Sequence, residues 1–287
     1  MTPAFGCVVL TAGRRPEDLR AAVESLLRQQ GVSTDVVVVG NGCCPGGVPD
    51  GVRVLALTVD DGIPAGRNAG AAQVGGELLF FLDDDASLDA PDALARVAQA
   101  FAADPGLGLL QLGVAPRDGG PYARDWVPRL RVGDRTRSSA ITVVWEGAVG
   151  MRRAVFDEVG GWPADFRFVH EGIDLGWRVM DAGHRVRYAG DIVVLHPSPT
   201  GTPHDYSYYF GARNRVWLAR RHLPLPLGAL YVTVFALRTV PRLKSRRAVQ
   251  EAACGYRDGM RGPCPGRRRL RARTLLRMAR AGRPPIM

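Results

Sequence analysis

Three consecutive carboxylates, Asp83, Asp84 and Asp85, directly follow a predicted apolar strand over residues 77–82. Like charges this close repel one another, and a bound divalent cation removes that repulsion. Hard oxygen ligands in this arrangement suit Mg²⁺ or Mn²⁺, which usually completes its coordination shell with substrate phosphates and water. The alternative is a solvated acidic turn that caps the next helix. The position after a wholly apolar strand favours the metal site, which sugar transfer, nucleotidyl transfer and phosphate hydrolysis could each use.

The first hundred residues alternate strand and helix patterns. We predict, in chain order, a strand at 7–10, a helix from Pro16, strands at 35–39 and 52–57, a helix at 65–74, the strand at 77–82 and a helix from Pro91. This order predicts an α/β fold with a Rossmann-like, mostly parallel sheet flanked by helices. Ligands bind such sheets at the carboxyl ends of the strands, which is where the acidic triplet lies.

This alternation ends after residue 115. Residues 115–138 are rich in Arg, Asp, Gly and Pro and lack periodicity, so we expect a long surface loop. Beyond it we predict helices near 152–159, 173–181 and 206–221, with strands near 186–188 and 192–195. One catalytic-sized α/β domain over residues 1–222, followed by an extension over residues 223–287, fits this pattern better than two equal domains.

The net charge of +10 is concentrated in the last fifty residues. Residues 238–287 hold 15 Lys and Arg against two acids, a net of +13, which leaves about −3 for residues 1–237. An apolar stretch at 223–237 precedes this segment and is too short to span a bilayer. A helical extension of this kind suits an anionic membrane surface, or packing on the catalytic domain or on a partner such as a second copy of the chain.

Several function classes are disfavoured. Hydrophobic residues at 46% and charged residues at 23% exclude wholesale disorder. The arginine-rich tail carries no recognisable nucleic-acid module, so we expect no nucleic-acid partner. The five cysteines have no metal-binding spacing and the N-terminus has no signal-peptide pattern, so we expect a cytoplasmic protein, with peripheral association at the inner face of the plasma membrane as an option.

Several motifs recur in a fixed order along the chain: GIPAGRNAG at 62–70, FFLDDD at 80–85, GAVGMRRAVFDEVGGW at 147–162, HEGIDL at 170–175 and a strand that ends at His196. In this order they resemble family-2 glycosyltransferases, inverting enzymes of the GT-A fold, and the resemblance runs over roughly residues 6–222. A rhamnosyltransferase-like subgroup is one option within it.

The resemblance implies a metal and a nucleotide-sugar site. Asp83 and Asp85 would bind Mg²⁺ or Mn²⁺, with His196 as a third ligand. The residues that would contact the nucleotide sugar are Thr11, Arg14 or Arg15, Glu17, Asn41, Arg67, Asp83, Asp84 and Arg213. Among these, Arg67 would bind the diphosphate, since it lies near a helix N-terminus. Gly40 stands where the family commonly has a carboxylate, for which Asp60 or Asp61 could substitute.

Inverting transfer also needs a carboxylate that accepts the proton of the acceptor hydroxyl. The family commonly takes it from an E-D-x-D element, and here Gly172 replaces the inner Asp. Glu171 and Asp174 remain, one helical turn apart, and we expect Glu171 to be the base with Asp174 as the second choice. The residues Trp145, Glu146, Trp162 and His170 lie beside these motifs and could shape the sugar or acceptor pocket.

These observations predict a metal-assisted glycosyltransferase. It would move a sugar from a UDP-, dTDP- or GDP-linked donor to a hydroxyl of a glycan, a lipid-linked glycan or a natural product. One alternative is a nucleotidyltransferase, although the glycine-rich loop of that class is not found after the first strand. The other is a degenerate module that binds sugar nucleotides without catalysis, which the two missing carboxylates favour.

Overall fold

Two hydrophobic clusters lie on the two faces of one central sheet. Along the first strand, Cys7 and Val9 point into one cluster and Val8 into the other, because successive side chains of a strand point to opposite faces. Both faces are therefore buried, as expected for strands that carry apolar residues in an unbroken run. The computed structural model describes residues 2–198 and 207–285.

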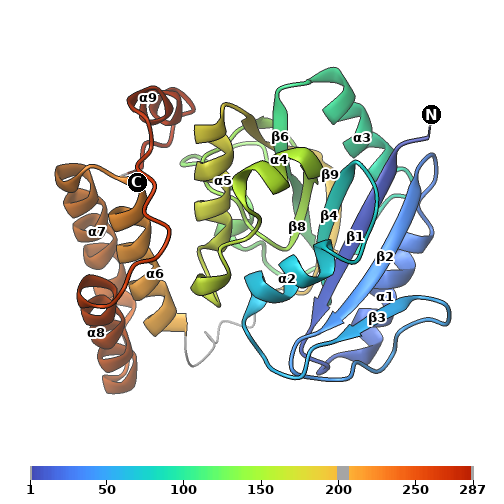
Figure 1. The fold of residues 1–287 in the computed structure, drawn as a ribbon, viewed down its shortest axis with the longest axis horizontal. Coiled ribbons are helices and arrows are strands. Elements are labelled where there is room, and N and C mark those ends of the chain that lie inside the picture. The colour runs from blue at the N-terminus through green and yellow to red at the C-terminus, as the bar shows by residue number, and fades with distance from the viewer. Residues whose placement is uncertain (1, 199–206, 286–287) are drawn as a thin grey trace.

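The elements follow in the order shown in Figure 1. The strands are β1 (Ala4–Thr11), β2 (Ser33–Gly40), β3 (Arg53–Ala56), β4 (Leu78–Asp83), β5 (Ser87–Leu88), β6 (Leu107–Pro116), β7 (Ser139–Ala140), β8 (Ala148–Arg152) and β9 (Arg185–His196). The helices are α1 (Pro16–Leu27), α2 (Ile63–Ala71), α3 (Ala93–Ala103), α4 (Arg153–Val159), α5 (Glu171–Ala182), α6 (Ser207–His222), α7 (Leu225–Thr239), α8 (Arg246–Arg261) and α9 (Ala272–Arg280). Short 3₁₀ turns cover Arg124–Trp126, Ala164–Phe166 and Val240–Arg242.

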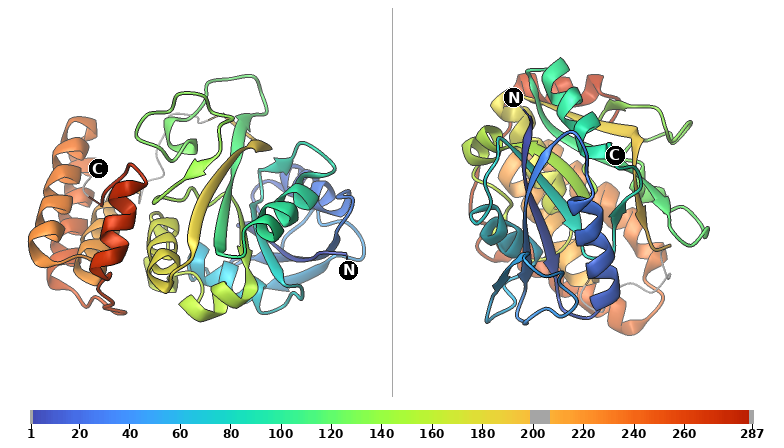
Figure 2. Two further views of the ribbon diagram at one scale, coloured as in Figure 1. Left: turned by 90° about the horizontal axis from the view of Figure 1, so that it is seen from above. Right: turned by 90° about the vertical axis from the view of Figure 1, so that its right-hand side faces the viewer.

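The sheet has the order β3-β2-β1-β4-β8-β6-β9-β5, and β7 pairs with β9. The strands β3, β2, β1 and β4 are parallel, which confirms the half of the sheet predicted from the first hundred residues. Next to them, β8 runs antiparallel to both β4 and β6. Helices α1 and α3 cover one face, and α2, α4 and α5 cover the other (Figures 1 and 2).

The structure differs from the expected strands in two places. The sequence predicts no strand over the segment of β6, although nearly all of β6 is buried. The two strands expected near 186–188 and 192–195 are one strand, β9. Its pairing with β6 shifts between Leu112 and Gly113, so that residues 190–192 form a bulge. A bulge interrupts the alternation that sequence reading depends on.

The C-terminal helices form a layer beyond α5 (Figures 1 and 2). Helix α8 approaches α6 closely, since a Cβ on Gly255 would lie 2.2 Å from the carbonyl oxygen of Tyr209. The tail after α8 is fixed to α5, because the Asp181 carboxylate accepts hydrogen bonds from the Arg271 amide and the Thr274 hydroxyl. Among the described residues, no helix is long and apolar enough to cross a membrane.

The chain enters α5 through a strained segment. Arg167, Val169 and His170 all have positive φ, at 61°, 54° and 70°, and this conformation is a rare one for a β-branched residue such as Val169. The buried side-chain amide of Asn214 in α6 donates to the carbonyl oxygens of Phe166, Phe168 and Val169 at 2.8–3.1 Å. Strained backbone persists only where its surroundings hold it. Helix α6 therefore fixes where α5 begins.

Replacing Asn214 with alanine is expected to lower the free energy of unfolding by about 1–3 kcal/mol, because it removes a donor that three carbonyl groups of the strained segment share. Asn214→Asp is expected to cost more, since its carboxylate would face carbonyl oxygens. The exposed amide of Gln250 provides the control, and Gln250→Ala is expected to change little. Urea denaturation measures all three. A wild-type midpoint for both Asn214 variants would contradict the role of α6.

Candidate functional site

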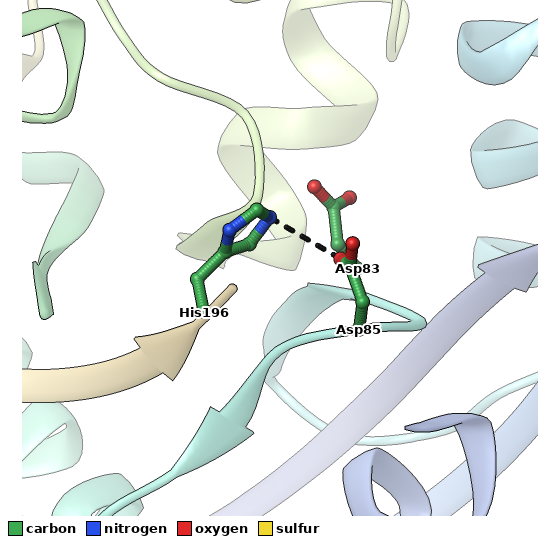
Figure 3. Close-up of side chains that lie close together, drawn as sticks. All are labelled: Asp83, Asp85 and His196. Carbon is green, nitrogen blue, oxygen red and sulfur yellow. Dashed lines mark ion pairs between the residues drawn. The ribbon is translucent and has the colours of Figure 1, made fainter. Parts of the chain in front are cut away.

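Asp83, Asp85 and His196 meet at the carboxyl ends of β4 and β9 (Figure 3). One ligand atom from each lies within 4.8 Å of the others, and the Nε2 atom of His196 is 3.2 Å from Asp85 Oδ1. The other ring nitrogen of His196, Nδ1, lies 2.8 Å from the Pro197 carbonyl oxygen, so that Nδ1–H donates there and Nε2 faces the carboxylates. The three expected metal ligands thus form one group.

The charges in this group shift one another's protonation. Burial alone would raise the pKa of Asp85. The hydrogen bond with His196 and the charge of that imidazole instead hold this pKa below its usual range. The same contact raises the pKa of His196, against the opposing effect of burial. The rings of Trp126 and Trp145 pack edge-on against His196, with centroids 5.6 and 5.5 Å from it. They fix the plane of the imidazole.

Asp84 points away from this group and toward β1. It accepts a hydrogen bond of 2.6 Å from the Thr11 hydroxyl, and Arg15 forms ion pairs with both Asp84 and Asp85. Burial raises the pKa of Asp84, and the contacts with Thr11 and Arg15 partly oppose that effect. Of the two arginines considered after β1, Arg15 is therefore the one that reaches the acidic triplet.

Arg67 joins the metal group to helix α5. Its side chain is almost fully buried; one terminal nitrogen donates to Asp83 at 2.7 Å, and the other lies 3.7 Å from Glu171 Oε1. The guanidinium also lies over the Trp162 ring, 4.9 Å from its centroid. The Nη1 atom is buried and donates to no described residue. A buried guanidinium N–H without an acceptor is a donor available to an anionic ligand.

Asp60 reaches the end of β2 from the loop before α2. Its Oδ1 atom accepts a hydrogen bond of 2.7 Å from the Asn41 side-chain amide and one of 2.8 Å from the Gly62 backbone N–H. A carboxylate is thus present beside Asn41 although Gly40 supplies none. Gly40 itself has no room for a side chain, because a Cβ would lie 2.2 Å from the Cys43 carbonyl oxygen. Of the two aspartates considered, Asp60 makes this contact.

Two carboxylates lie together at the start of α5. Glu171 is 3% exposed, and burial raises its pKa while the charge of Arg67 opposes that effect. Glu146, from the loop before β8, accepts a hydrogen bond of 2.7 Å from the Gly172 backbone N–H. Burial and the charge of Glu171 raise the pKa of Glu146. Such a pair holds a proton more readily than an isolated carboxylate does.

The structure does not bring Asp174 into this group. Its carboxylate is 1% exposed and contacts His222 at 2.7 Å and Arg178 at 2.6 Å. Burial alone would raise its pKa, but the Arg178 charge and the His222 hydrogen bond hold that pKa below its usual range. The expectation that Asp174 faces the cleft beside Glu171 therefore needs correction, because its carboxylate faces α6, where it contacts His222.

Arg213 also lies elsewhere than expected. Its guanidinium donates to the carbonyl oxygens of Asp165 and Phe166 and lies between the rings of Phe210 and Trp217. These contacts stabilise the turn before α5, and they leave Arg213 outside the metal group. The expected nucleotide contacts Arg14 and Glu17 are both exposed, and they form no hydrogen bond or ion pair with the part of the chain that the structure describes.

A cavity of about 220 Å³ opens next to the carboxylate pair. Segment 142–146, the start of α5 and helices α6 and α7 line it, through residues that include Glu146, Trp177, Arg215, Tyr231 and Phe235. Arg215 lies 3.5 Å from the Phe235 ring centroid and donates to the Tyr231 hydroxyl. The sequence predicts that Trp145, Glu146 and His170 could shape a sugar or acceptor pocket, and all three line this cavity. It assigns no role there to Trp177, Tyr231 and Phe235, because these residues come from distant segments.

A family model described as glycosyl transferase family 2 matches residues 7–160. No curated protein matches the chain. One similar solved structure is a mannosyltransferase, PcManGT from Pyrobaculum calidifontis in complex with GDP-Man and Mn²⁺, at 18% identity and a TM-score of 0.59, covering 98% of this chain and 80% of that one.

Two further solved structures are similar to this chain. One is GalNAc-T7 with UDP, GalNAc and Mn²⁺, at 14% identity and a TM-score of 0.63, covering 90% of this chain and 55% of that one. The other is residues 1–349 of TarS from S. aureus, at 14% identity and a TM-score of 0.52, covering 91% and 92%. At these identities the likeness concerns the fold.

The family model covers more than half of the chain, and the architecture confirms the expected GT-A fold. The motifs from GRN to the acidic triplet and the Gly-Gly-Trp turn all lie in or next to the matched segment. The chain belongs to glycosyl transferase family 2.

Proposed function

We propose that this protein transfers a sugar from a nucleotide-diphosphate donor to an acceptor hydroxyl, with inversion and with the help of a divalent cation. The observation that carries the proposal is the group of Asp83, Asp85 and His196 beside the buried guanidinium of Arg67. Two carboxylates and one imidazole nitrogen are a donor set that fits Mn²⁺ or Mg²⁺. Two of the similar solved structures contain Mn²⁺ together with a nucleotide or nucleotide sugar.

The cation, when bound, neutralises charge on the leaving nucleoside diphosphate. Two arginines of the chain would provide further positive charge for the diphosphate. Arg67 presents a buried N–H without a described acceptor, which suits a diphosphate oxygen. Arg15, half exposed above Asp84 and Asp85, supplies a second guanidinium at the same edge of the sheet.

Thr11, Asn41 and Asp60 are proposed to form the nucleoside side of the site. They lie at the ends of β1 and β2, and the Oδ1 atom of Asn41 is buried without a described hydrogen-bond donor. A ribose hydroxyl or a base N–H of a UDP-, dTDP- or GDP-linked sugar would satisfy it. The exposed Arg14 and Glu17 would lie at the rim of this site.

The acceptor is proposed to enter through the 220 Å³ cavity that Glu146 lines. Its aromatic wall of Trp177, Tyr231 and Phe235 favours an acceptor with an apolar part, such as a lipid-linked glycan or an apolar natural product. The attacking hydroxyl would then lie between the carboxylate pair at α5 and the sugar on the diphosphate.

The turn from α7 to α8 is proposed to contact an anionic membrane, such as the inner face of the plasma membrane. Leu237 and Val240 are 69% and 63% exposed there, and the exposed cations Arg238, Arg242 and Lys244 surround them. Apolar side chains with adjacent cations are the chemistry that binds an anionic lipid surface, at roughly 1 kcal/mol per cation.

Asp85→Asn is expected to abolish the stabilisation that Mn²⁺ and a nucleoside diphosphate together give to the protein. The substitution keeps the side-chain shape and removes the charge that holds the cation. Thermal denaturation with UDP, GDP and dTDP, each with and without Mn²⁺ or Mg²⁺, measures the effect, since ligand binding stabilises the folded state. Asp191→Asn, an exposed carboxylate paired with Arg96, is the control. An unchanged cation-dependent shift in Asp85→Asn would contradict the metal site.

Cation binding is expected to strengthen as the pH rises from about 5.5 to 8. Contact with Asp85 raises the pKa of His196 above its ordinary value, so the cation-free protein keeps the proton on His196 to a higher pH than a free imidazole would. The cation must displace that proton, and binding releases it. Calorimetric titration with Mn²⁺ across this pH range measures both affinity and proton release. An affinity that does not change with pH would argue against His196 as a ligand.

Asp60→Ala is expected to weaken nucleotide binding about tenfold or more and to leave Mn²⁺ affinity unchanged, because Asp60 contacts Asn41 and lies apart from the metal group. Asp61→Ala is the matched control. Competition among UDP, GDP and dTDP identifies the preferred base. Equal nucleotide affinity in Asp60→Ala and wild type would remove Asp60 from the nucleoside side of the site.

Reversing Arg242 and Lys244 to glutamate is expected to reduce sedimentation with vesicles that contain anionic phosphatidylglycerol. Reversing Arg20 on α1 and Arg28 directly after it changes the net charge equally and is the control. Neutral phosphatidylcholine vesicles are expected to bind little of any variant. If both variants lose vesicle binding equally, net charge alone explains the binding. If the wild type binds no vesicles, the membrane proposal is wrong and the C-terminal helices serve only in packing.

A further inference from the structure

Gly172 leaves a gap in the acidic start of α5, and another residue fills it. A Cβ at position 172 would lie 2.7 Å from both Cγ and Oε1 of Glu146. The carboxylate of Glu146 therefore occupies the space that a side chain at position 172 would take. The Gly172 backbone N–H donates to it at 2.7 Å, which holds it against the first turn of the helix.

The flanking residues place Glu146 beside the metal group. The ring of Trp145 packs against His196, and the carbonyl oxygen of Gly147 accepts the backbone N–H of Asp83 at 3.0 Å. Glu146 itself lines the 220 Å³ cavity on its other side. It is thus the carboxylate that lies between the proposed donor site and the proposed acceptor cavity, which is where a base for the acceptor hydroxyl must be.

Glu171 is placed differently. Its carboxylate faces Arg67 at 3.7 Å, which in turn donates to Asp83, and Glu171 is not among the residues that line the cavity. The Oε1 atom of Glu146 accepts the Gly172 N–H, and no other described residue donates a hydrogen bond to its Oε2 atom. One member of the pair is therefore engaged with the cation-binding side, and the other has an oxygen available on the acceptor side.

We propose that Glu146 is the catalytic base of this enzyme and that Glu171 is a positioning residue for Arg67. This assignment rests on the proposed glycosyl transfer. The acceptor O–H proton moves to Glu146 Oε2 while that oxygen bonds to the anomeric carbon. The bond between the anomeric carbon and the diphosphate oxygen breaks, and its electron pair leaves with the nucleoside diphosphate. Glu146, which lies 26 positions earlier in the chain, thus takes the role of base that a carboxylate at position 172 would have.

Glu146→Gln and Glu171→Gln separate the two roles. Glutamine at 146 keeps the oxygen that accepts the Gly172 N–H, so the start of α5 is retained and the base is lost. The measured reaction is release of nucleoside diphosphate from UDP-, GDP- and dTDP-sugars with Mn²⁺, with water and added glycerol as acceptors. The same nucleotides without the sugar probe binding by thermal denaturation.

We expect Glu146→Gln to lower kcat for release by about 100-fold or more, with the KM for donor and the nucleotide-induced thermal shift unchanged. Glu146→Asp is expected to retain more activity than Glu146→Gln, because it keeps a carboxylate. Glu171→Gln is expected to raise the KM for donor, since it disturbs Arg67, and to lower kcat less. Equal melting temperatures of the three variants and the wild type establish that the fold is intact.

Two results would overturn the assignment of Glu146 as the base without affecting the proposed function. In one, Glu146→Gln releases nucleoside diphosphate as fast as the wild type. In the other, Glu171→Gln no longer releases nucleoside diphosphate although it binds the donor as the wild type does, which would make Glu171 the base. A wild-type protein that neither binds nor cleaves any of the nucleotide sugars would overturn the proposed function, and this assignment with it.

Discussion

Several carboxylates lie close together in a largely buried site, and their mutual repulsion is the constraint on which the rest of the site depends. Asp83, Asp85, Glu146 and Glu171 come from three separate segments and would repel one another if nothing opposed their charge. Arg67 is the cation that lies among them, bound to Asp83 on one side and near Glu171 on the other. Its burial on the Trp162 ring fixes it there. In the proposed function, a bound divalent cation and a diphosphate would complete this balance of charge.

The remainder of the fold holds these charges in place. The positive-φ approach to α5 sets the position of Glu171 and Gly172, and Asn214 in α6 binds three of its carbonyl groups. Helix α6 is in turn tied to α5 by the contact of His222 with Asp174. Helices α6 and α7 also complete the cavity wall. The C-terminal helices thus contribute to the site, although much of the basic charge lies on their outer surface.

Sequence reading found the metal group because its residues follow the ends of apolar strands, where a parallel sheet brings them together. The resemblance to the family points to Thr11 and Arg67, and it leaves Asp60 and Asp61 as alternatives for the missing carboxylate. The sequence places Glu146 near the sugar or acceptor pocket, but it does not show that its carboxylate fills the space next to Gly172, because the two residues belong to segments distant in the sequence. It also expected Asp174 and Arg213 in the site. Helical spacing shows which residues share a face, and it does not show that α6 packs against that face.

In the proposed site, the carboxylates and Arg67 surround a cation bound to a diphosphate. Anomalous diffraction from crystals grown with Mn²⁺ and the preferred nucleoside diphosphate can locate both groups. We expect one manganese peak in contact with Asp83, Asp85 and His196, and a diphosphate oxygen within hydrogen-bond distance of Arg67 Nη1. A nucleotide bound without a manganese peak at these residues, or with its phosphates turned away from Arg67, would contradict it.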